Sequence, residues 1–324
     1  MNSRLLRIRA WEVIARSKNR VLNLLDAPLI VLLYHRVADL PRDPQMLAVS
    51  PENFREQLKF LKENLPIVKL DSSFDTMPRP AVAITFDDGY ADNCQNALPI
   101  LEELQLPATF FISPGYISGN VEFWWDEAER VILESPTLPS IVELPNDELA
   151  CPFTVEEDRT TRYLKLLSYI RKLDAPLRAQ LLGSIRASCG EAAAARESHR
   201  PLNYVELRIL AESPLAIIGG HGVTHTPLSA ISAERQREEI LGSKKALEEM
   251  TGKEVRLFSY PLGTRVDYTK ESVSFCREAG FTAAASNFPG QVHRWTDRYQ
   301  LPRHLVRNWP LETFKKNLQS FWTL

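Results

Sequence analysis

The chain has 324 residues, of which 44% are hydrophobic and 25% are charged, so it is long enough to bury a substantial core in one large domain or two small ones. Its 39 basic and 41 acidic residues leave a net charge of −2. This balance excludes binding through a bulk positive field, and we expect no nucleic-acid partner.

Residues 1–24 predict an amphipathic helix with a basic flank, because apolar side chains such as Leu5, Ile8 and Trp11 recur among arginines and lysines. The segment lacks the features of a secretory signal, and no later stretch is apolar over the ~18 residues that a membrane span needs. We therefore expect cytoplasmic residence. The helix either packs on the domain or makes peripheral contact with the inner membrane face.

Apolar runs of strand length follow, and helical patterns separate most of them. The runs are residues 28–34, 81–86, 108–112, 215–220, 256–260 and 281–286. One helix is capped at Ser50, and another ends at Gly252. Strands that are apolar throughout and alternate with helices are typical of a parallel sheet covered on both faces. The predicted fold class is α/β, with the sheet closed into a (β/α) barrel.

The alternation stops between about residues 120 and 212, where the sequence reads as consecutive helices. We interpret this stretch as a helical insertion on one loop of a single barrel domain, residues 25–324. Four cysteines lie far apart and form no CxxC pair, so we expect buried free thiols, as in a reducing compartment. They are Cys94, Cys151, Cys189 and Cys276.

Polar residues follow several of the predicted strands. Asp87 and Asp88 come after the run 81–86, His221 and His225 come after the run 215–220, and His35 follows the first run. Ligands bind at the carboxyl ends of parallel strands, where the loops converge. Taken singly, each feature also has an ordinary explanation, such as a helix cap or a partly buried histidine.

Together, one carboxylate and two imidazoles form a ligand set that leaves open positions on a divalent metal. Neighbouring side chains in an extended segment point in different directions, so one aspartate binds the metal and the other faces a bound water. The metal would make that water acidic, and the second carboxylate would accept its proton. Zn²⁺ is the expected ion, although Co²⁺, Ni²⁺ or Fe²⁺ suits the same ligands.

The sequences TFDDGY (85–90) and HGVTH (221–225) resemble the first two motifs of the polysaccharide deacetylase family, also called NodB homology or carbohydrate esterase family 4 proteins. The resemblance implies a distorted (β/α) barrel that removes N-acetyl groups from amino sugars with a divalent ion. It further implies that Asp87 is the general base and that Asp88, His221 and His225 are the metal ligands.

The other expected roles also come from the resemblance. The segment LLYHRV resembles the branch with an N-terminal YHxV motif, which places the general acid on His35, with His304 as the competing candidate. The segment FSYPLG resembles the third motif, which implies an oxyanion donor on the main chain near Tyr260 and Pro261. Arg303 either holds Asp87 or is a plain surface arginine.

The sequence departs from the family pattern at two places. Gly222 stands where the family usually has serine or threonine, which predicts a less firmly held metal loop. The segment FSYPLG lacks the usual arginine. At the start of the insertion, Trp124 and Trp125 either stack on sugar rings or anchor the insertion to the barrel.

We therefore expect a deacetylase that acts on an N-acetylated amino sugar in a polysaccharide or a lipid-linked glycan precursor. Two alternatives stay open. One is hydrolysis of a different amide or ester on a glycan, and the other is a non-catalytic glycan-binding protein on the same fold. The sequence specifies no oligomeric state.

Overall fold

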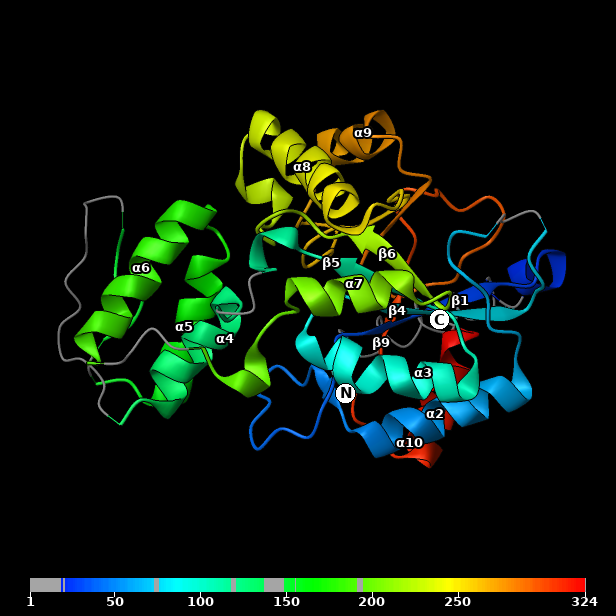
Figure 1. Ribbon diagram of the computed structural model, residues 1–324, viewed down its shortest axis with the longest axis horizontal. Coiled ribbons are helices and arrows are strands. Elements are labelled where there is room, and N and C mark those ends of the chain that lie inside the picture. The colour runs from blue at the N-terminus through cyan, green and yellow to red at the C-terminus, as the bar shows by residue number, and fades with distance from the viewer. Residues whose placement is uncertain are drawn as a thin grey trace, which may run out of the picture.

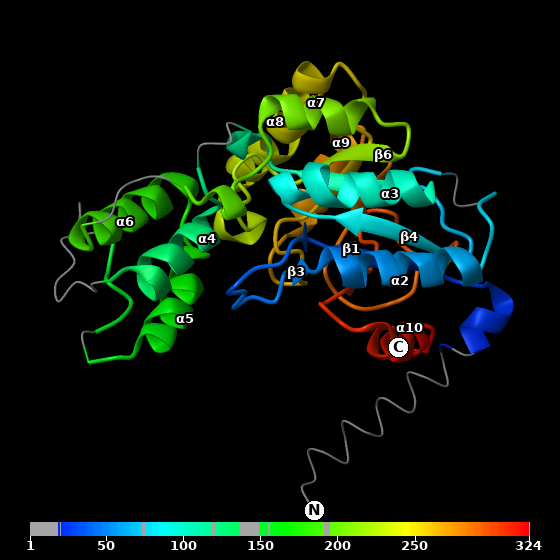
Figure 2. The ribbon, with the colours of Figure 1, turned by 60° about the horizontal axis from the view of Figure 1, so that its bottom comes forward.

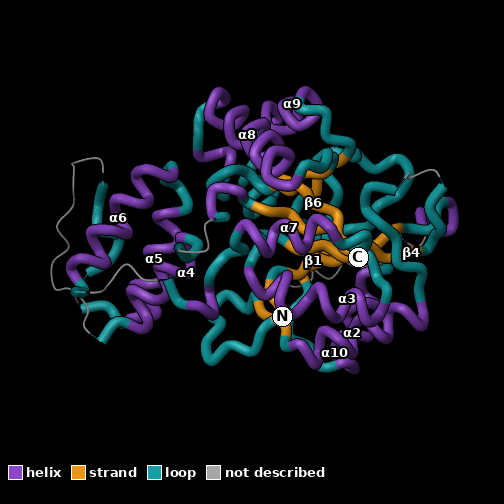
Figure 3. The backbone as a smooth tube through the Cα atoms, in the orientation of Figure 1, coloured by secondary structure: helices purple, strands orange, loops and turns teal. Residues whose placement is uncertain are grey.

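The structure is a computed structural model, and it describes residue 19 and residues 21–72, 76–117, 121–136, 149–154, 156–190 and 195–323. A sheet of seven parallel strands runs through its centre in the order β8-β7-β6-β5-β4-β1-β9, with helices around it (Figure 1 and Figure 3). The sheet curls into an incomplete barrel of the predicted fold class. Its strands are β1 (Leu29–Tyr34), β4 (Ala81–Phe86), β5 (Ala108–Ile112), β6 (Ala216–Gly220), β7 (Leu257–Ser259), β8 (Ala283–Ala285) and β9 (His304–Leu305).

The strands are buried on both faces. In β1, Ile30 and Leu32 point into the core between the sheet and its helices, whereas Leu29 and Val31 point into a second core on the opposite face. This alternation is the reason that the sequence shows continuous apolar runs. All six predicted strands are confirmed. The seventh, β9, was not predicted, because it is only two residues long.

The helices begin and end where their caps predict. The Ser50 side chain accepts a hydrogen bond from the Asn53 N–H at the start of α2 (Pro51–Asn64), and Gly252 ends α8 (Ala233–Thr251) in a left-handed conformation with φ 68°. Helices α7 and α8 pack against β6, and α2 packs against α3 and α10. The bounds are α3 (Leu98–Leu104), α7 (Tyr204–Glu212), α9 (Lys270–Glu278) and α10 (Leu311–Phe321).

The described parts of residues 121–190 form a helical lobe beside the barrel (Figure 1 and Figure 2). It contains α4 (Trp124–Glu129), the π-helical turn η3 (Arg130–Glu134), α5 (Arg159–Ile170) and α6 (Ala175–Ser188). These helices bury their own apolar cluster, to which Trp124, Trp125 and Leu166 belong. The lobe therefore has a core of its own, while the domain boundaries stay a prediction.

Most of the predicted N-terminal helix lies outside the described residues, although residues 21–25 are helical. Among the described helices, none combines the length and apolarity that crossing a bilayer requires. All four cysteines are free thiols. Three of them are buried, whereas Cys151 is half-buried.

Candidate active site

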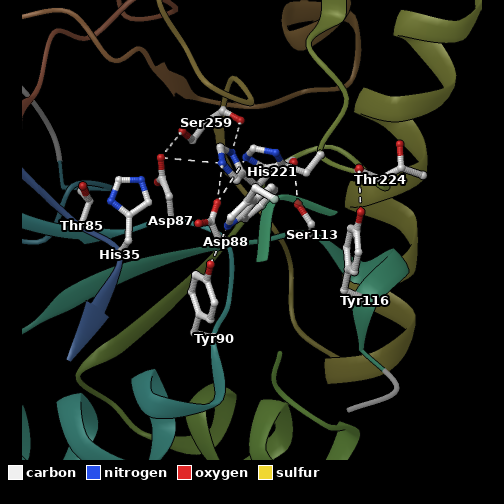
Figure 4. A network of polar contacts seen from close by, with 12 residues as sticks. His35, Thr85, Asp87, Asp88, Tyr90, Ser113, Tyr116, His221, Thr224 and Ser259 are labelled. Carbon is white, nitrogen blue, oxygen red and sulfur yellow. Dashed lines mark hydrogen bonds and ion pairs between the residues drawn. The ribbon is translucent and has the colours of Figure 1, made fainter. Parts of the chain in front are cut away.

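The ends of two strands, which flank β5 in the sheet, bring the acidic and imidazole groups together. Asp87 and Asp88 follow β4, and His221 follows β6, so their side chains meet at the carboxyl edge of the sheet (Figure 4). The chain turns sharply after β4, where Asp88 has φ 77° and Gly89 has φ 90°. Glycine adopts this left-handed region without a steric penalty, and aspartate tolerates it better than most residues.

Asp88 lies between two imidazoles. Its Oδ1 is 3.2 Å from Nε2 of His225 and 3.5 Å from Nε2 of His221. Ligand atoms about 2.1 Å from a tetrahedral ion lie roughly 3.4 Å apart, so these distances fit the edges of a zinc coordination shell. Nδ1 of His221 lies 2.7 Å from the Ser259 carbonyl oxygen, which orients its Nε2 toward Asp88. The three buried side chains therefore fit a divalent cation.

The electrostatics of this group favour an anionic Asp88. Burial alone would raise its pKa, but hydrogen bonds from His221 and His225 hold the pKa far below its ordinary value. Burial lowers the pKa of His225, although Asp88 opposes that shift. For His221, the two carboxylates outweigh burial and raise the pKa. Asp88 is thus in the protonation state that binds a cation.

Asp87 has a different partner. The Arg303 guanidinium, which is itself fully buried, donates from Nη1 to Oδ1 and from Nη2 to Oδ2 of Asp87, each at 2.7 Å. The Ser259 hydroxyl donates to Asp87 at 3.3 Å. Burial would raise the pKa of Asp87, but Arg303 and His221 hold it below the ordinary value. The adjacent carboxylates are therefore separated: one meets the imidazoles and the other is fixed by an arginine.

His35 and His304 have different surroundings. His35 is half-buried beside the carboxylates (Figure 4). Burial lowers its pKa, and Asp88 and Asp87 counteract this effect. His304 begins β9 directly after Arg303, so its side chain points the opposite way. It stacks on Phe321 at 4.0 Å, and its Nε2 is 2.9 Å from the Gly290 carbonyl. Burial lowers its pKa to about 4, which leaves it neutral at neutral pH.

The expected oxyanion donor near Tyr260 needs a correction. The Tyr260 N–H donates to the Ala285 carbonyl at 3.1 Å, because it belongs to the pairing of β7 with β8. Pro261 has no N–H. The next main-chain donor is the N–H of half-buried Leu262, whose left-handed φ of 59° marks a sharp turn after β7. The described residues supply no acceptor for it.

The adjacent tryptophans are buried, with exposed fractions of 6% for Trp124 and 4% for Trp125. Both belong to the core of the helical lobe. Little of either ring is left to stack on a sugar, so the geometry favours the anchoring alternative. Trp125 also packs its ring against His225, with ring centroids 4.5 Å apart.

The loop that carries the histidines is held by a residue that the sequence did not reveal. One carboxylate oxygen of Glu239 accepts hydrogen bonds from the N–H groups of Val223 and Thr224, and the other accepts one from the Thr224 hydroxyl. Gly222 has φ 68°, and a Cβ there would lie 3.0 Å from the Glu239 carboxylate. Glu239 therefore holds this loop in place, although Gly222 has no hydroxyl that could do so. It lies within a long helix of charged residues, where no pattern distinguishes it.

Among the described residues, a second acidic group brings Asp126, Glu129 and His199 within 4.8 Å of one another. Arg196 lies 3.5 Å from Glu129 and donates to the Asp126 carbonyl at 2.8 Å. Burial raises the pKa of Asp126 to about 8, against the charge of Arg36. A protonated carboxyl beside guanidinium groups is a poor cation ligand, so this group does not fit a divalent ion.

Comparison with known proteins identifies similar sequences and a matching family. The model of the polysaccharide deacetylase family matches residues 74–135 and 151–284, which is more than half of the chain. The Bacillus subtilis (strain 168) protein YxkH, which bears the name of a polysaccharide deacetylase, is 21% identical over 284 residues, covering 86% of this chain and 71% of that protein.

Two further relatives are similar over different extents. The poly-beta-1,6-N-acetyl-D-glucosamine N-deacetylase of Escherichia coli (strain K12) is 31% identical over 88 residues, which cover 25% of this chain and only 13% of that protein. The solved Streptococcus pyogenes deacetylase PplD, in complex with acetate, shares the fold with a TM-score of 0.58 and 15% identity, over 90% of this chain and 98% of that one.

The family match lies over the strands that carry Asp87, Asp88, His221 and His225. The chain belongs to the polysaccharide deacetylase family, hydrolases that act on the N-acetyl amide bonds of glycans.

Proposed function

We propose that the protein is a metal-dependent hydrolase that removes N-acetyl groups from an amino sugar in a polysaccharide or a lipid-linked glycan precursor. The observation that carries this proposal is the separation of the adjacent carboxylates. Asp88 contacts both imidazoles, whereas Asp87 is bound by Arg303 next to them. A cation ligand and a proton acceptor are thereby held side by side.

Asp88, His221 and His225 hold the divalent cation. Their mixture of one carboxylate and two imidazoles suits Zn²⁺, with Co²⁺, Ni²⁺ and Fe²⁺ as competitors. When bound, the cation supplies Lewis acidity, which makes water acidic and polarises the acetamide carbonyl. Three protein ligands leave positions open for water and substrate.

Asp87 is the general base. It accepts a proton from the water whose oxygen forms the new bond to the acetamide carbon. The bidentate contact with Arg303 keeps Asp87 ionised and fixes the direction of its oxygens. Arg303 acts through Asp87 and is a positioning residue.

His35 is the general acid, and it gives a proton to the amide nitrogen as the C–N bond breaks, so that acetate and a free amine leave. Burial lowers the pKa of His35, and the nearby charges of Asp88 and Asp87 offset part of that shift. The contacts of His304 with Phe321 and Gly290 favour His35 over it. The main-chain N–H of Leu262 is the proposed donor to the developing oxyanion.

The substrate proposal starts from N-acetylglucosamine units, because the Escherichia coli relative is named for a polymer of that sugar. Its similarity covers a quarter of this chain. Oligomers of N-acetylglucosamine and lipid-linked N-acetylated sugars are therefore the first substrates to test.

The test measures acetate release by the Zn²⁺-loaded protein from this panel, with Asp87→Asn as the inactive variant and Asp297→Asn as the matched control. Asp297 makes an exposed ion pair with Arg277, so the control applies the same chemical change away from the site. We expect release by the parent and the control and a loss of at least about a hundredfold in Asp87→Asn. Stoichiometric Zn²⁺ without acetate release would reject the deacetylase assignment.

A further inference from the structure

The two histidines of the metal group are supported unequally. Nδ1 of His221 has the Ser259 carbonyl as its partner, whereas Nδ1 of His225 is buried without a hydrogen-bond partner among the described residues. A metal-binding imidazole usually donates its second N–H to an acceptor that fixes its orientation. His225 also has φ 51°, a conformation that disfavours a residue with a Cβ. Its ring must therefore be held by other contacts.

Trp125 supplies that contact. Its ring lies 4.5 Å from the ring of His225, centroid to centroid, at an angle of 57°. The indole is itself fixed from two sides. Its Nε1 donates to the hydroxyl of Tyr90 at 2.7 Å, and its ring stacks on Phe123 with centroids 4.7 Å apart and planes 4° from parallel. Trp125 thus has one orientation, in which its face limits the movement of His225.

The hydrogen bond to Tyr90 continues into the lobe. The Tyr90 hydroxyl donates to Oδ2 of Asp126 at 2.7 Å, and the guanidinium of Arg36 covers the Tyr90 ring at 4.2 Å from its centroid. Tyr90 lies two residues after Asp88, whereas Trp125 and Asp126 lie on α4 of the helical lobe. Helix α4 is therefore tied to the segment of Asp88 by two hydrogen bonds and to His225 by ring packing.

We propose that Trp125 is a positioning residue for the metal ligand His225, and that Tyr90 and Asp126 act on His225 through the indole. This inference rests on the metal site of the proposed function. The first turn of α4 borders that site. The ring contact of Trp125 orients His225 in place of the hydrogen bond that Nδ1 of His225 lacks. Trp125 does not touch the ion or the reacting atoms.

The experiment compares the Zn²⁺ dissociation constants of the parent, Trp125→Phe, Tyr90→Phe and the double variant, measured by competition with a chromophoric chelator. Trp124→Phe is the matched control. Trp124 is equally buried, but its ring centroid is 6.5 Å from that of His225 and its Nε1 has no hydrogen-bond partner among the described residues. The free energy of unfolding of each metal-free variant is measured as well, to separate affinity from general destabilisation.

We expect Trp125→Phe and Tyr90→Phe each to weaken Zn²⁺ binding by about tenfold, the lower end of the effect seen when the partners of metal ligands are removed. The double variant should bind like the single ones, because both substitutions act on the same indole. The Zn²⁺ dissociation constant of Trp124→Phe should stay within about twofold of that of the parent. This should hold even if Trp124→Phe and Trp125→Phe lose the same free energy of unfolding.

The outcomes separate this inference from the proposed function. A parent without stoichiometric Zn²⁺ would reject the metal site and, with it, both proposals. A parent that binds Zn²⁺ while Trp125→Phe matches Trp124→Phe in affinity would overturn the role of Trp125 alone. Additive losses in the double variant would overturn the claim that Tyr90 acts through the indole.

Discussion

Arg303 contacts several buried groups in addition to Asp87. Besides both oxygens of Asp87, it donates to the Ser286 carbonyl, the Thr85 hydroxyl and the Ser259 hydroxyl. A guanidinium so fully engaged cannot swing away during a reaction. The pair therefore has a structural as well as an electrostatic role, because both charged side chains are buried.

Replacing Arg303 by methionine should lower the free energy of unfolding by about 3–5 kcal/mol, since an unpaired carboxylate would stay buried. Chemical denaturation of the metal-free protein measures this loss. Arg303→Lys keeps the charge but not the bidentate geometry, and its loss should be smaller. Equal stability of the parent and Arg303→Met would contradict the buried ion pair.

Asp126 predicts a pH dependence of stability. Burial raises its pKa from an ordinary 3.8 to about 8. Below the ordinary value both the folded and the unfolded chain carry the proton, and the full stability is present. As the pH rises, the unfolded chain loses its proton first, so this contribution declines by up to about 1.4 kcal/mol per pH unit until the folded group ionises near pH 8.

The measurement is the free energy of unfolding at pH 5 and at pH 8 for the parent and Asp126→Asn. The parent should lose more stability over this interval than the variant, which has no carboxyl at this position. Parallel curves would show that Asp126 titrates normally in the folded protein.

Among the elements, α8 has a function beyond covering the sheet, because its Glu239 binds the loop of the two histidines. Glu239→Ala removes the carboxylate that accepts three hydrogen bonds from this loop. We therefore expect the free energy of unfolding to fall by about 2–4 kcal/mol and Zn²⁺ binding to weaken. The neighbouring Glu238→Ala is the control, since the Glu238 side chain is 73% exposed. Denaturation and metal titration of both variants test this role, and matching results for the two would exclude it.

Regular elements were predictable where local chemistry specifies them. The apolar runs revealed six strands because both faces of the sheet are buried, and Ser50 and Gly252 revealed helix ends because caps are local. Strand β9 is too short to leave a pattern. The place of Asp87 and His221 at strand ends was predictable from the same runs, as was their meeting at one edge.

Other features depend on contacts that a linear pattern does not contain. The N–H of Tyr260 belongs to the sheet, which no motif reveals, and for this reason the proposed oxyanion donor is the N–H of Leu262. Glu239 and Asp126 contact residues that lie 15 and 36 positions away in the sequence, in other elements. Trp125 was open to two interpretations, and only its burial separates them.

For the whole molecule, the described end of the N-terminal segment leaves Leu24 87% exposed and Leu25 74% exposed. The residues before it are rich in arginine and lysine. We propose that the N-terminal segment, residues 1–24, binds anionic bilayers through its basic and apolar side chains. This would bring the site to a lipid-linked substrate.

Co-sedimentation with vesicles of phosphatidylglycerol and phosphatidylcholine tests this contact. The parent should sediment with these vesicles at low salt, and Leu24→Glu combined with Leu25→Glu should reduce the bound fraction severalfold. The control is Leu164→Glu, which makes the same substitution at an exposed leucine on α5 of the lobe. A buried leucine such as Leu318 would be unsuitable, because it belongs to the barrel core. Equal sedimentation of the parent and the double variant would place the contact elsewhere or nowhere.

The residues of the site are far apart along the chain: Asp87 is 172 positions from Ser259 and 216 from Arg303. During synthesis, the two carboxylates leave the ribosome long before the serine, the arginine and the two later histidines that they contact. The contacts of Asp87 are complete only when Arg303, directly before the last strand, takes its place at the edge of the sheet, and pairings of such long range form slowly. If the proposed cation binds the folded chain in preference to the unfolded one, its supply would shift the folding equilibrium toward completed molecules by mass action.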